Sequence, residues 1–456
     1  MEPRPTGSLA RTDNRLAFLD QASFLRLRAT GVETVGQWTC LYDRAVDMDG
    51  LRRFNENLGH GLLGRRIECS PLPFGRHRWV MCHEPPDIDV AAWPRPRTDI
   101  GTWLDERAQI PIDPEHGPCW HIGVLRLEEG GTAVTVVFSH TVVDGVGFCV
   151  AVNEAVNGRT RDFGYPPPRS RNRLRALLVD GLDTLRGLPA VFRALIAIIV
   201  IVVRRGRDTA GLSESPPFAA PQPDDDEPIV LPAVTVFCDL AEWDARAVDL
   251  GGNSSSLFIG FAARLAELLG RVNATDGGVT ITVPVSERAP DDTRGNALTS
   301  VTFRVDPTRA TDLPVIRNEM AQSLAALQQA PNELLKSLPL TPLTPKWLAR
   351  KMEGLALGNS DLPVCCSNMR DMYPAMANID GADADYCSGA LFNQGATRRN
   401  IEDGNGQLYI CSGRINGRLF IRSIAYQPGI ENSKKYLRAM LEQALADYEL
   451  TAEIEE

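Results

Sequence analysis

The sequence predicts an α/β (α+β) protein with two globular halves joined by an unusual middle segment. Its 456 residues are enough for two or three domains. A content of 43% hydrophobic and 23% charged residues is typical of a globular protein. Strand-like and helix-like patterns occur on both sides of an arginine-rich stretch. We therefore expect an N-terminal half at 1–168, a crossover and linker at 169–228, and a C-terminal half at 229–456.

The first half contains two predicted helices and a predicted hairpin. Leucine and phenylalanine recur at helical spacing in Asp47–Leu58, and a second helix is expected from Val146 to Val156. Two β-branched runs between Trp120 and Phe138 flank a turn at 128–131, which is typical of a β-hairpin. The glycines at 59–64 fit GxGxxG, but they follow a helix-like segment, so we interpret them as a helix end rather than a dinucleotide site.

The middle segment is basic and amphipathic. Residues 169–207 carry nine arginines, opposed by Asp180 and Asp183. One helical face carries leucines at positions 174, 177, 178, 182 and 185. Residues 194–203 are all apolar, but a helix that spans a bilayer needs about 20 such residues. Two interpretations stay open: an interfacial helix that contacts a membrane, or a linker helix whose apolar run packs between the halves. The proline- and acid-rich tract Ser213–Pro228 is predicted to be an exposed linker.

The second half again mixes strands and helices. Strands are expected at 235–240, 279–285 and 299–305, and helices at 257–269 and 432–448. A second hairpin is expected where 408–413 and 419–425 flank a turn containing Asn416 and Gly417.

Several classes of function are disfavoured by composition. The net charge of −10 argues against a general nucleic-acid binder. The ten cysteines have no CxxC spacing, which argues against a zinc or redox site, so we predict no metal. Residues 1–14 lack the apolar core of a secretory signal. We expect a cytoplasmic protein, with peripheral contact at the inner face of the membrane through 169–207 as the membrane-binding alternative.

The most informative motif is His140-Thr141-Val142-Val143-Asp144-Gly145. It directly follows a predicted strand, where a side chain can be held rigidly at a cleft. An imidazole titrates near pH 6.5 and can take a proton from a hydroxyl or an amine. Asp144 could orient the loop or pair with an arginine, while Gly145 and Gly147 allow close backbone approach. We therefore predict His140 as the catalytic residue. The alternative is a buried histidine that only satisfies its hydrogen bonds.

These residues resemble the wax ester synthase/diacylglycerol acyltransferase family, which is grouped with condensation domains and plant BAHD acyltransferases. The shared motif of those proteins is HHxxxDG, or HxxxD in the plant branch. Other segments resemble the family in the same order along most of the chain. They are Leu19–Leu25 (LDQASFL), 71–80 (PLPFGRHRWV), 283–288 (VPVSER), Gly295-Asn296 and Ser367-Asn368.

The resemblance implies two chloramphenicol-acetyltransferase-like subdomains, each a mixed sheet flanked by helices, with the active-site tunnel between them. It implies that His140 is the general base and that Asp144 pairs with Arg288 of the second half as a structural element. The alternative for Arg288 is a surface arginine beside an acidic loop. The substrate pocket is expected to include Ser139, Gly147, Asn296, Ser367 and Asn368. No cofactor is implied, because acyl-CoA or an acyl carrier protein thioester would be a substrate.

The sequence also departs from the family pattern. Ser139 stands where the first histidine of HHxxxDG is expected, although the plant branch works with the second histidine alone. The proline-glycine turn of SNVPGP is replaced by Met369-Arg370-Asp371-Met372, and Asn253–Ser256 stands where the family has Asn-Asp.

Three hypotheses follow from the resemblance and these departures. The first is transfer of an acyl group from acyl-CoA to the hydroxyl of a lipophilic alcohol or a diacylglycerol-like acceptor. The second is a carrier-protein-dependent acyltransferase or condensation enzyme that acts on a polyketide, glycolipid or peptide. The third is a condensation-like binding protein without catalysis.

Overall fold

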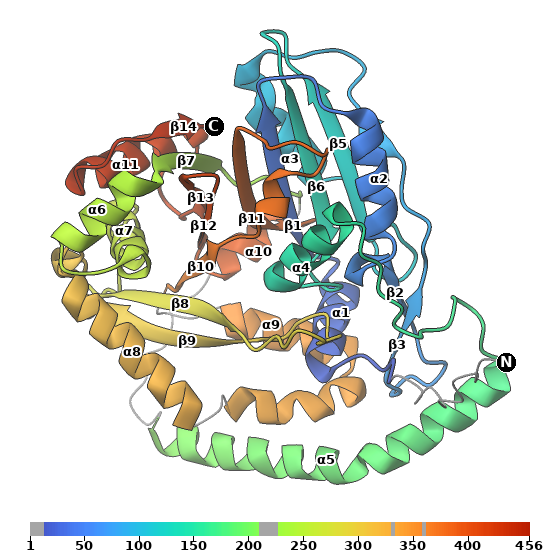
Figure 1. Cartoon of the computed structure of the whole chain (residues 1–456). Helices are drawn as coiled ribbons and strands as arrows, with labels where there is room; N and C mark the ends of the chain where they lie inside the picture. Colours follow the sequence, from blue (N-terminus) through green and yellow to red (C-terminus); the bar gives the residue numbers. More distant parts are fainter. Residues whose placement is uncertain (1–12, 209–226, 330–332, 358–361) are drawn as a thin grey trace, which may run out of the picture.

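The structure is a computed structural model that describes residues 13–208, 227–329, 333–357 and 362–456. Two sheet-containing bodies lie side by side, above one long helix (Figure 1). The sheet of the first body has the strand order β11-β1-β6-β5-β4. Its strands are β1 Glu33–Tyr42, β4 Ile88–Val90, β5 Trp120–Arg126, β6 Thr132–Ser139 and β11 Tyr386–Gln394.

Short helices and a small sheet complete the first body. They are α1 Phe18–Thr30, α2 Met48–Leu58, α3 Ile100–Ala108, α4 Gly145–Val156, the 3-10 turns η1 Leu62–Gly64 and η2 Arg97–Asp99, and strands β2 Arg65–Glu68 and β3 Arg78–Met81. The helix and hairpin predictions are confirmed. Helix α2 begins where the side chain of Asp47 accepts a hydrogen bond from the Asp49 amide, and it buries Leu51, Phe54 and Leu58 on one face.

The second body is built on a seven-stranded sheet in the order β14-β7-β13-β12-β10-β8-β9. Its strands are β7 Ala233–Asp239, β8 Val279–Ser286, β9 Leu298–Val305, β10 Val364–Asp371, β12 Gln407–Ile415, β13 Arg418–Tyr426 and β14 Glu453–Glu455. Its helices are α6 Leu240–Asp249, α7 Ser254–Leu268, α8 Leu313–Gln329, α9 Lys346–Leu357, α10 Arg398–Asp403 and α11 Lys434–Asp447, with 3-10 segments η4 Pro307–Arg309, η5 Glu333–Leu343 and η6 Pro374–Ala377.

Each main sheet is mixed, as the predicted fold class requires. Strand β4 is parallel to β5, and β10 is parallel to both β8 and β12, whereas the other ladders are antiparallel.

Asn253 does not reproduce the Asn-Asp of the family pattern. It caps α7 instead, because its side chain accepts from the Ser256 amide while the Ser256 hydroxyl accepts from the Asn253 amide.

Strand β11 ties the two bodies together. It belongs to the stretch 229–456, yet it pairs with β1 in the sheet of the first body, in a register that places Cys40 opposite Cys387. The predicted domain boundaries do not include this exchange, in which a strand from the second half of the chain joins the first sheet. The first sheet is therefore complete only when β11 is present.

Helix α5 (Arg173–Asp208) is a single 36-residue helix along the lower side of the molecule (Figure 1). It includes both the leucine face and the start of the apolar run that were predicted in 169–207. The described part of that run does not pack between the halves, because Leu195, Ile196 and Ile199 are 46%, 47% and 61% exposed. The predicted linker at Ser213–Pro228 lies almost entirely outside the described residues.

Candidate active site

The motif loop begins where strand β6 ends. The backbone amide of His140 donates to the Thr34 carbonyl of neighbouring strand β1 at 2.9 Å, which fixes the histidine at the end of the central strand of the sheet. Four residues later Asp144 caps helix α4, and its Oδ1 accepts from the Gly147 amide at 2.7 Å. The strand end and the helix cap therefore hold the loop from both sides.

Asp144 and Arg288 form a buried ion pair between the two halves, in the arrangement that the family resemblance implies. The Nη2 of Arg288 lies 2.8 Å from Asp144 Oδ2, and its Nε lies 3.2 Å from Oδ1, while both side chains are at most 4% exposed. The same guanidinium donates to the carbonyls of Asp292, Arg294 and Gly295. A buried charge pair with this many hydrogen bonds rigidifies the loop on both sides of it.

The segment 287–297 closes over the motif loop through further hydrogen bonds. The side chain of Asn296 donates to the His140 carbonyl at 3.1 Å, and the Asp144 amide donates to the Gly295 carbonyl at 2.8 Å. Asp20 accepts from the amides of Gly295 and Asn296 at 2.9 and 2.6 Å. At Gly295 a Cβ atom would lie 3.0 Å from the Thr141 carbonyl oxygen, so this close approach requires glycine.

A cavity of about 320 Å³ opens between the two bodies at His140. His140, Asp144 and Gly145 contribute to its walls from the motif, and Ser367 and Asn368 contribute from β10. Most of the other walls are apolar. They include Trp38, Phe138, Phe148, Leu298, Met369, Met372, Met376 and Phe420. Ser286 adds a hydroxyl, so the cavity combines an imidazole and a few polar groups with a mainly hydrophobic surface.

Ser139, Gly147 and Asn296, which were predicted to line the pocket, are not among the cavity-lining residues. Successive strand residues point to opposite faces, so Ser139 faces away from the side of His140. Gly147 instead lies behind the wall, where a Cβ atom would come within 3.0 Å of the Arg288 guanidinium carbon. Asn296 acts on the loop through the His140 carbonyl.

Burial lowers the pKa of His140, and the nearby Arg288 contributes to this shift, while Asp144 and Asn296 oppose it. The imidazole is consequently neutral at neutral pH. A neutral imidazole in a largely apolar cavity is able to accept a proton from a bound hydroxyl or amine.

Glu33 is a site residue that the sequence analysis did not identify. Its buried carboxylate accepts from the Ser139 hydroxyl at 2.5 Å and from the Thr141 hydroxyl at 3.3 Å, so it contacts both neighbours of His140. Burial raises the pKa of Glu33 to about 7. A buried carboxyl group thus holds Ser139, the residue before His140, in place.

Arg65 and Asp20 were also not assigned a role from sequence. Arg65 is fully buried, and its guanidinium donates to the carbonyls of Val142 in the motif loop and Thr293 in the closing segment. Asp20 lies in the segment that resembles the family opening, which was the one available signal for it. An isolated arginine at the start of a short strand carries no comparable signal.

A second and larger cavity, of about 590 Å³, adjoins the first. The two share Cys365, Leu391 and Tyr409 as lining residues. Arg26, Arg271 and Arg350 line the second cavity, opposed by Asp403. The structure therefore places two adjoining cavities between the bodies, where the active-site tunnel was expected.

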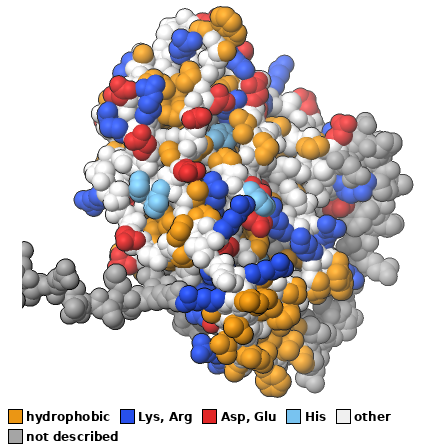
Figure 2. Space-filling view, turned by 90° about the vertical axis from the view of Figure 1, so that its right-hand side faces the viewer, with side chains coloured by type: hydrophobic (Ala, Val, Ile, Leu, Met, Phe, Trp, Pro, Cys, Tyr) orange, Lys and Arg blue, Asp and Glu red, His pale blue; other side chains and the backbone are white. Residues whose placement is uncertain are grey.

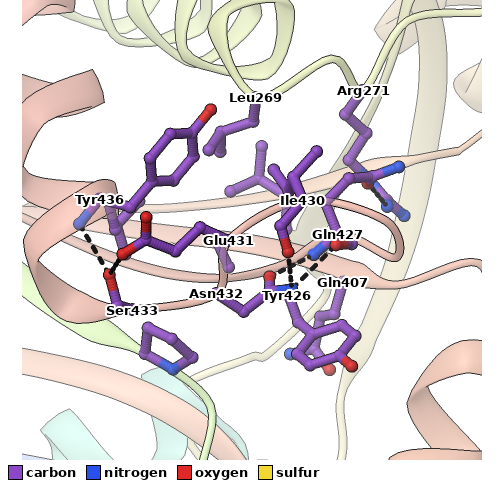
Figure 3. Close-up of a pocket in the computed structure, with 14 residues that line it drawn as sticks. Leu269, Arg271, Gln407, Tyr426, Gln427, Ile430, Glu431, Asn432, Ser433 and Tyr436 are labelled. Carbon is purple, nitrogen blue, oxygen red and sulfur yellow. Dashed lines mark hydrogen bonds between the residues drawn. The ribbon is translucent and has the colours of Figure 1, made fainter.

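A small cavity beside Arg271 has different properties (Figure 3). Its volume of about 10 Å³ has room for about one water molecule. The surrounding polar groups already bond to one another: the Tyr436 amide donates to the Ser433 hydroxyl at 3.0 Å, and Arg271 donates to Gln427 at 3.1 Å. We assign it no functional role.

The two mixed-sheet bodies with cavities between them have a fold that is similar to that of condensation domains and of a wax ester synthase. The chain is similar to polyketide synthase associated protein 5 from Mycobacterium tuberculosis, with a TM-score of 0.52, 15% identity, and 95% of this chain and 98% of that chain covered. It is also similar to the first condensation domain of the calcium-dependent antibiotic synthetase, with a TM-score of 0.56 at 13% identity. That match covers 95% of this chain and 96% of that chain.

A wax ester synthase/diacylglycerol acyltransferase from Marinobacter aquaeolei VT8 is similar to the same degree. Its TM-score is 0.53 at 15% identity, with 96% of this chain and 100% of that chain covered. No family model matches the sequence, and no curated protein matches it. At identities of 13–15% these likenesses show the fold.

Proposed function

We propose that this protein is an acyltransferase that moves an acyl group from acyl-CoA to the hydroxyl of a lipophilic alcohol or a diacylglycerol-like acceptor. The observation that carries the proposal is the position of His140. It lies at a strand end held by the Asp144–Arg288 pair, and it faces a cavity whose walls come from both bodies.

In the proposed reaction His140 acts as general base. It accepts the proton of the acceptor hydroxyl while the oxygen attacks the thioester carbonyl, and the tetrahedral intermediate then breaks its carbon–sulfur bond. The imidazolium returns the proton to the departing thiolate, so no covalent enzyme intermediate is required. Ser286, Ser367 and Asn368 line the same cavity and supply donors for the oxyanion.

The two cavities suit different parts of the substrates. The wall formed by aromatic residues and methionines near His140 suits an acyl chain or a lipophilic acceptor. Arg26 and Arg350 in the larger cavity suit the phosphates of coenzyme A, whereas Arg271 is buried and donates to backbone carbonyls. A lipophilic acceptor would be supplied by a membrane, and we assign contact with that membrane to the segment 169–207.

The second candidate function is acyl transfer from a carrier protein. The departures at Ser139 and after Asn368 support it, since they alter the loop and the strand end beside the cavity. Arg26 and Arg350 equally suit the phosphate of a carrier's phosphopantetheine arm. A binding role without catalysis is less well supported, because His140 lines an open cavity of about 320 Å³ rather than a filled core.

Product mass spectrometry tests these alternatives. Purified protein is incubated with mixed acyl-CoA donors and a panel of long-chain alcohols, diacylglycerol and amines, alongside the variants His140→Ala and His116→Ala. His116 is an exposed histidine outside the site and serves as the matched control. We expect a new ester whose rate of formation falls roughly 10²- to 10⁴-fold in His140→Ala and stays unchanged in His116→Ala.

Equal turnover by wild type and His140→Ala would refute the base assignment. Product from acylated carrier protein and none from acyl-CoA would support the second candidate function. Because burial lowers the pKa of His140 and the base must be unprotonated, kcat/KM should fall on the acid side at a lower pH than an ordinary histidine would give.

A further inference from the structure

The outer face of helix α5 is a continuous apolar surface. Ten of its described large apolar side chains are exposed, and all but Val179 (39% exposed) recur mostly three or four positions apart and therefore fall on one side of the helix. Those on that side are 46–71% exposed: Leu174, Leu178, Leu182, Leu185, Leu188, Phe192, Leu195, Ile196 and Ile199. Because isolated exposed leucines are common but rows of them are not, this outer stripe indicates a binding surface.

The apolar surface extends beyond the helix. A cavity of about 50 Å³ beside α5 is lined by Leu188 together with Phe74 and Leu343. Phe74 and Leu343 are themselves 42% and 45% exposed. Figure 2 shows hydrophobic side chains gathered at the lower end of the molecule, with Lys and Arg side chains beside them.

The charges of α5 are separated by sign. Asp180 and Asp183, its acidic residues between 173 and 199, point toward the protein and pair with Arg78 at 3.1 and 2.5 Å. Asp180 also accepts from Arg171 and from the Ser70 hydroxyl. This inner face holds the helix to the body of the protein without using the outer stripe.

Exposed arginines border the stripe on both edges: Arg173 lies on one edge, and the other three lie along the opposite edge. Arg175, Arg186 and Arg193 are exposed and near-whole numbers of helical turns apart. Over 173–199 the outward charge is therefore positive, in a protein whose net charge is −10. Apolar side chains bordered by arginines match the two layers of an anionic membrane surface, acyl chains below and phosphates above.

We infer that α5 docks this protein on anionic lipid bilayers by lying in the interface, with the outer stripe inserted and the arginines at the headgroups. No helix in the described residues has the length and apolarity to cross a membrane, which agrees with an interfacial position. The inference names a membrane partner for the proposed function, but it rests on the surface of α5 alone and not on the chemistry of His140.

Vesicle flotation tests this inference with the full chain. Wild type is mixed with phosphatidylcholine vesicles and with phosphatidylcholine–phosphatidylglycerol vesicles at low and high salt. We expect binding to the anionic vesicles that weakens at high salt. The combined variant Leu178→Gln, Leu182→Gln and Leu185→Gln should lower partitioning roughly tenfold or more. Arg175→Gln with Arg186→Gln and Arg193→Gln should lower it roughly a hundredfold.

Matched controls separate the stripe from general surface properties. Val90, Val248 and Ile430 are exposed apolar residues elsewhere on the surface, and their change to Gln should leave flotation unchanged. Arg52→Gln with Arg53→Gln removes exposed arginines on α2 and should have little effect.

Two results would overturn the inference: no flotation of wild type with anionic vesicles at low salt, or equal flotation of wild type and the leucine variant. A wild-type dimer in analytical ultracentrifugation that the leucine variant abolishes, without vesicle binding, would assign the stripe to a second copy instead. Turnover of a short-chain, water-soluble acceptor should be unchanged in both α5 variants. If wild type bound the vesicles but turned over no acceptor, the proposed chemistry alone would be contradicted and the membrane inference would stand.

Discussion

Arg288 in the closing segment and the arginines of helix α5 illustrate two opposite uses of one residue type. Arg288 is buried, bonded to both oxygens of Asp144 and to three backbone carbonyls. Arg175, Arg186 and Arg193 are exposed along an apolar stripe. In the first region charge fixes a loop within the protein, and in the second it is available to a partner. The difference teaches that burial, rather than residue type, decides what an arginine contributes.

The largest effect is expected from breaking the buried pair. Asp144→Ala leaves the Arg288 guanidinium uncompensated between the two halves, which should lower the free energy of unfolding by about 3–5 kcal/mol. Urea denaturation followed by tryptophan fluorescence measures it. Glu442→Ala, which removes one partner of the exposed Arg438–Glu442 pair at 2.9 Å, is the matched control and should cost less than about 1 kcal/mol. Equal losses in the two variants would contradict the comparison.

An intermediate effect, dependent on pH, is expected at Glu33. Its pKa is raised from 4.5 to about 7, so the folded state holds a proton that the unfolded state releases. The free energy of unfolding should therefore fall as pH rises from 4.5 to 7, by up to about 3 kcal/mol, and stay level above that range. In Glu33→Gln this part of the decline should disappear.

Denaturation of wild type and Glu33→Gln at pH 5 and pH 8 measures the difference. Burial also raises the pKa of Asp20 and Glu455, but both groups are present in both proteins and cancel. Parallel pH curves for the two proteins would show that the Glu33 carboxyl has an ordinary pKa.

The smallest effect on stability is expected at the outer stripe of α5. Leu178→Gln, Leu182→Gln and Leu185→Gln change side chains that are 70%, 53% and 63% exposed, so each should shift the free energy of unfolding by about 0.5 kcal/mol or less. Thermal denaturation checks this. A loss comparable to that of Asp144→Ala would mean that the stripe is part of the core.

Local patterns were sufficient to predict local structure. Helix α2 and the hairpins β5–β6 and β12–β13 follow from periodicity and turn residues, because their stabilising contacts are close in sequence. The Asp144–Arg288 pair was reached only through the family resemblance, since the two residues are far apart in the chain and follow no shared period.

The remaining features depend on tertiary contacts that no local pattern encodes. Glu33 is one carboxyl in an otherwise largely buried strand, and nothing in its segment shows that it lies under Ser139. The exposure of the α5 leucines was likewise unpredictable, because an amphipathic pattern does not distinguish a face on the core from a face on a partner. The pairing of β11 with β1 is also absent from any local pattern, because strands β7 to β10 of the second body lie between the two strands in the sequence.

The exchange of β11 has a consequence for synthesis. Strand β1 receives its outer neighbour only after residue 394 has left the ribosome, because Glu33 pairs with Gln394. Until then β1 is an open sheet edge, which is prone to pairing with other chains. The loop that carries His140 likewise lacks its hydrogen-bond partners until the segment 287–297 has been synthesised. A nascent chain should therefore gain a closed site only near the end of translation, and fragments that stop before β11 should need chaperone protection.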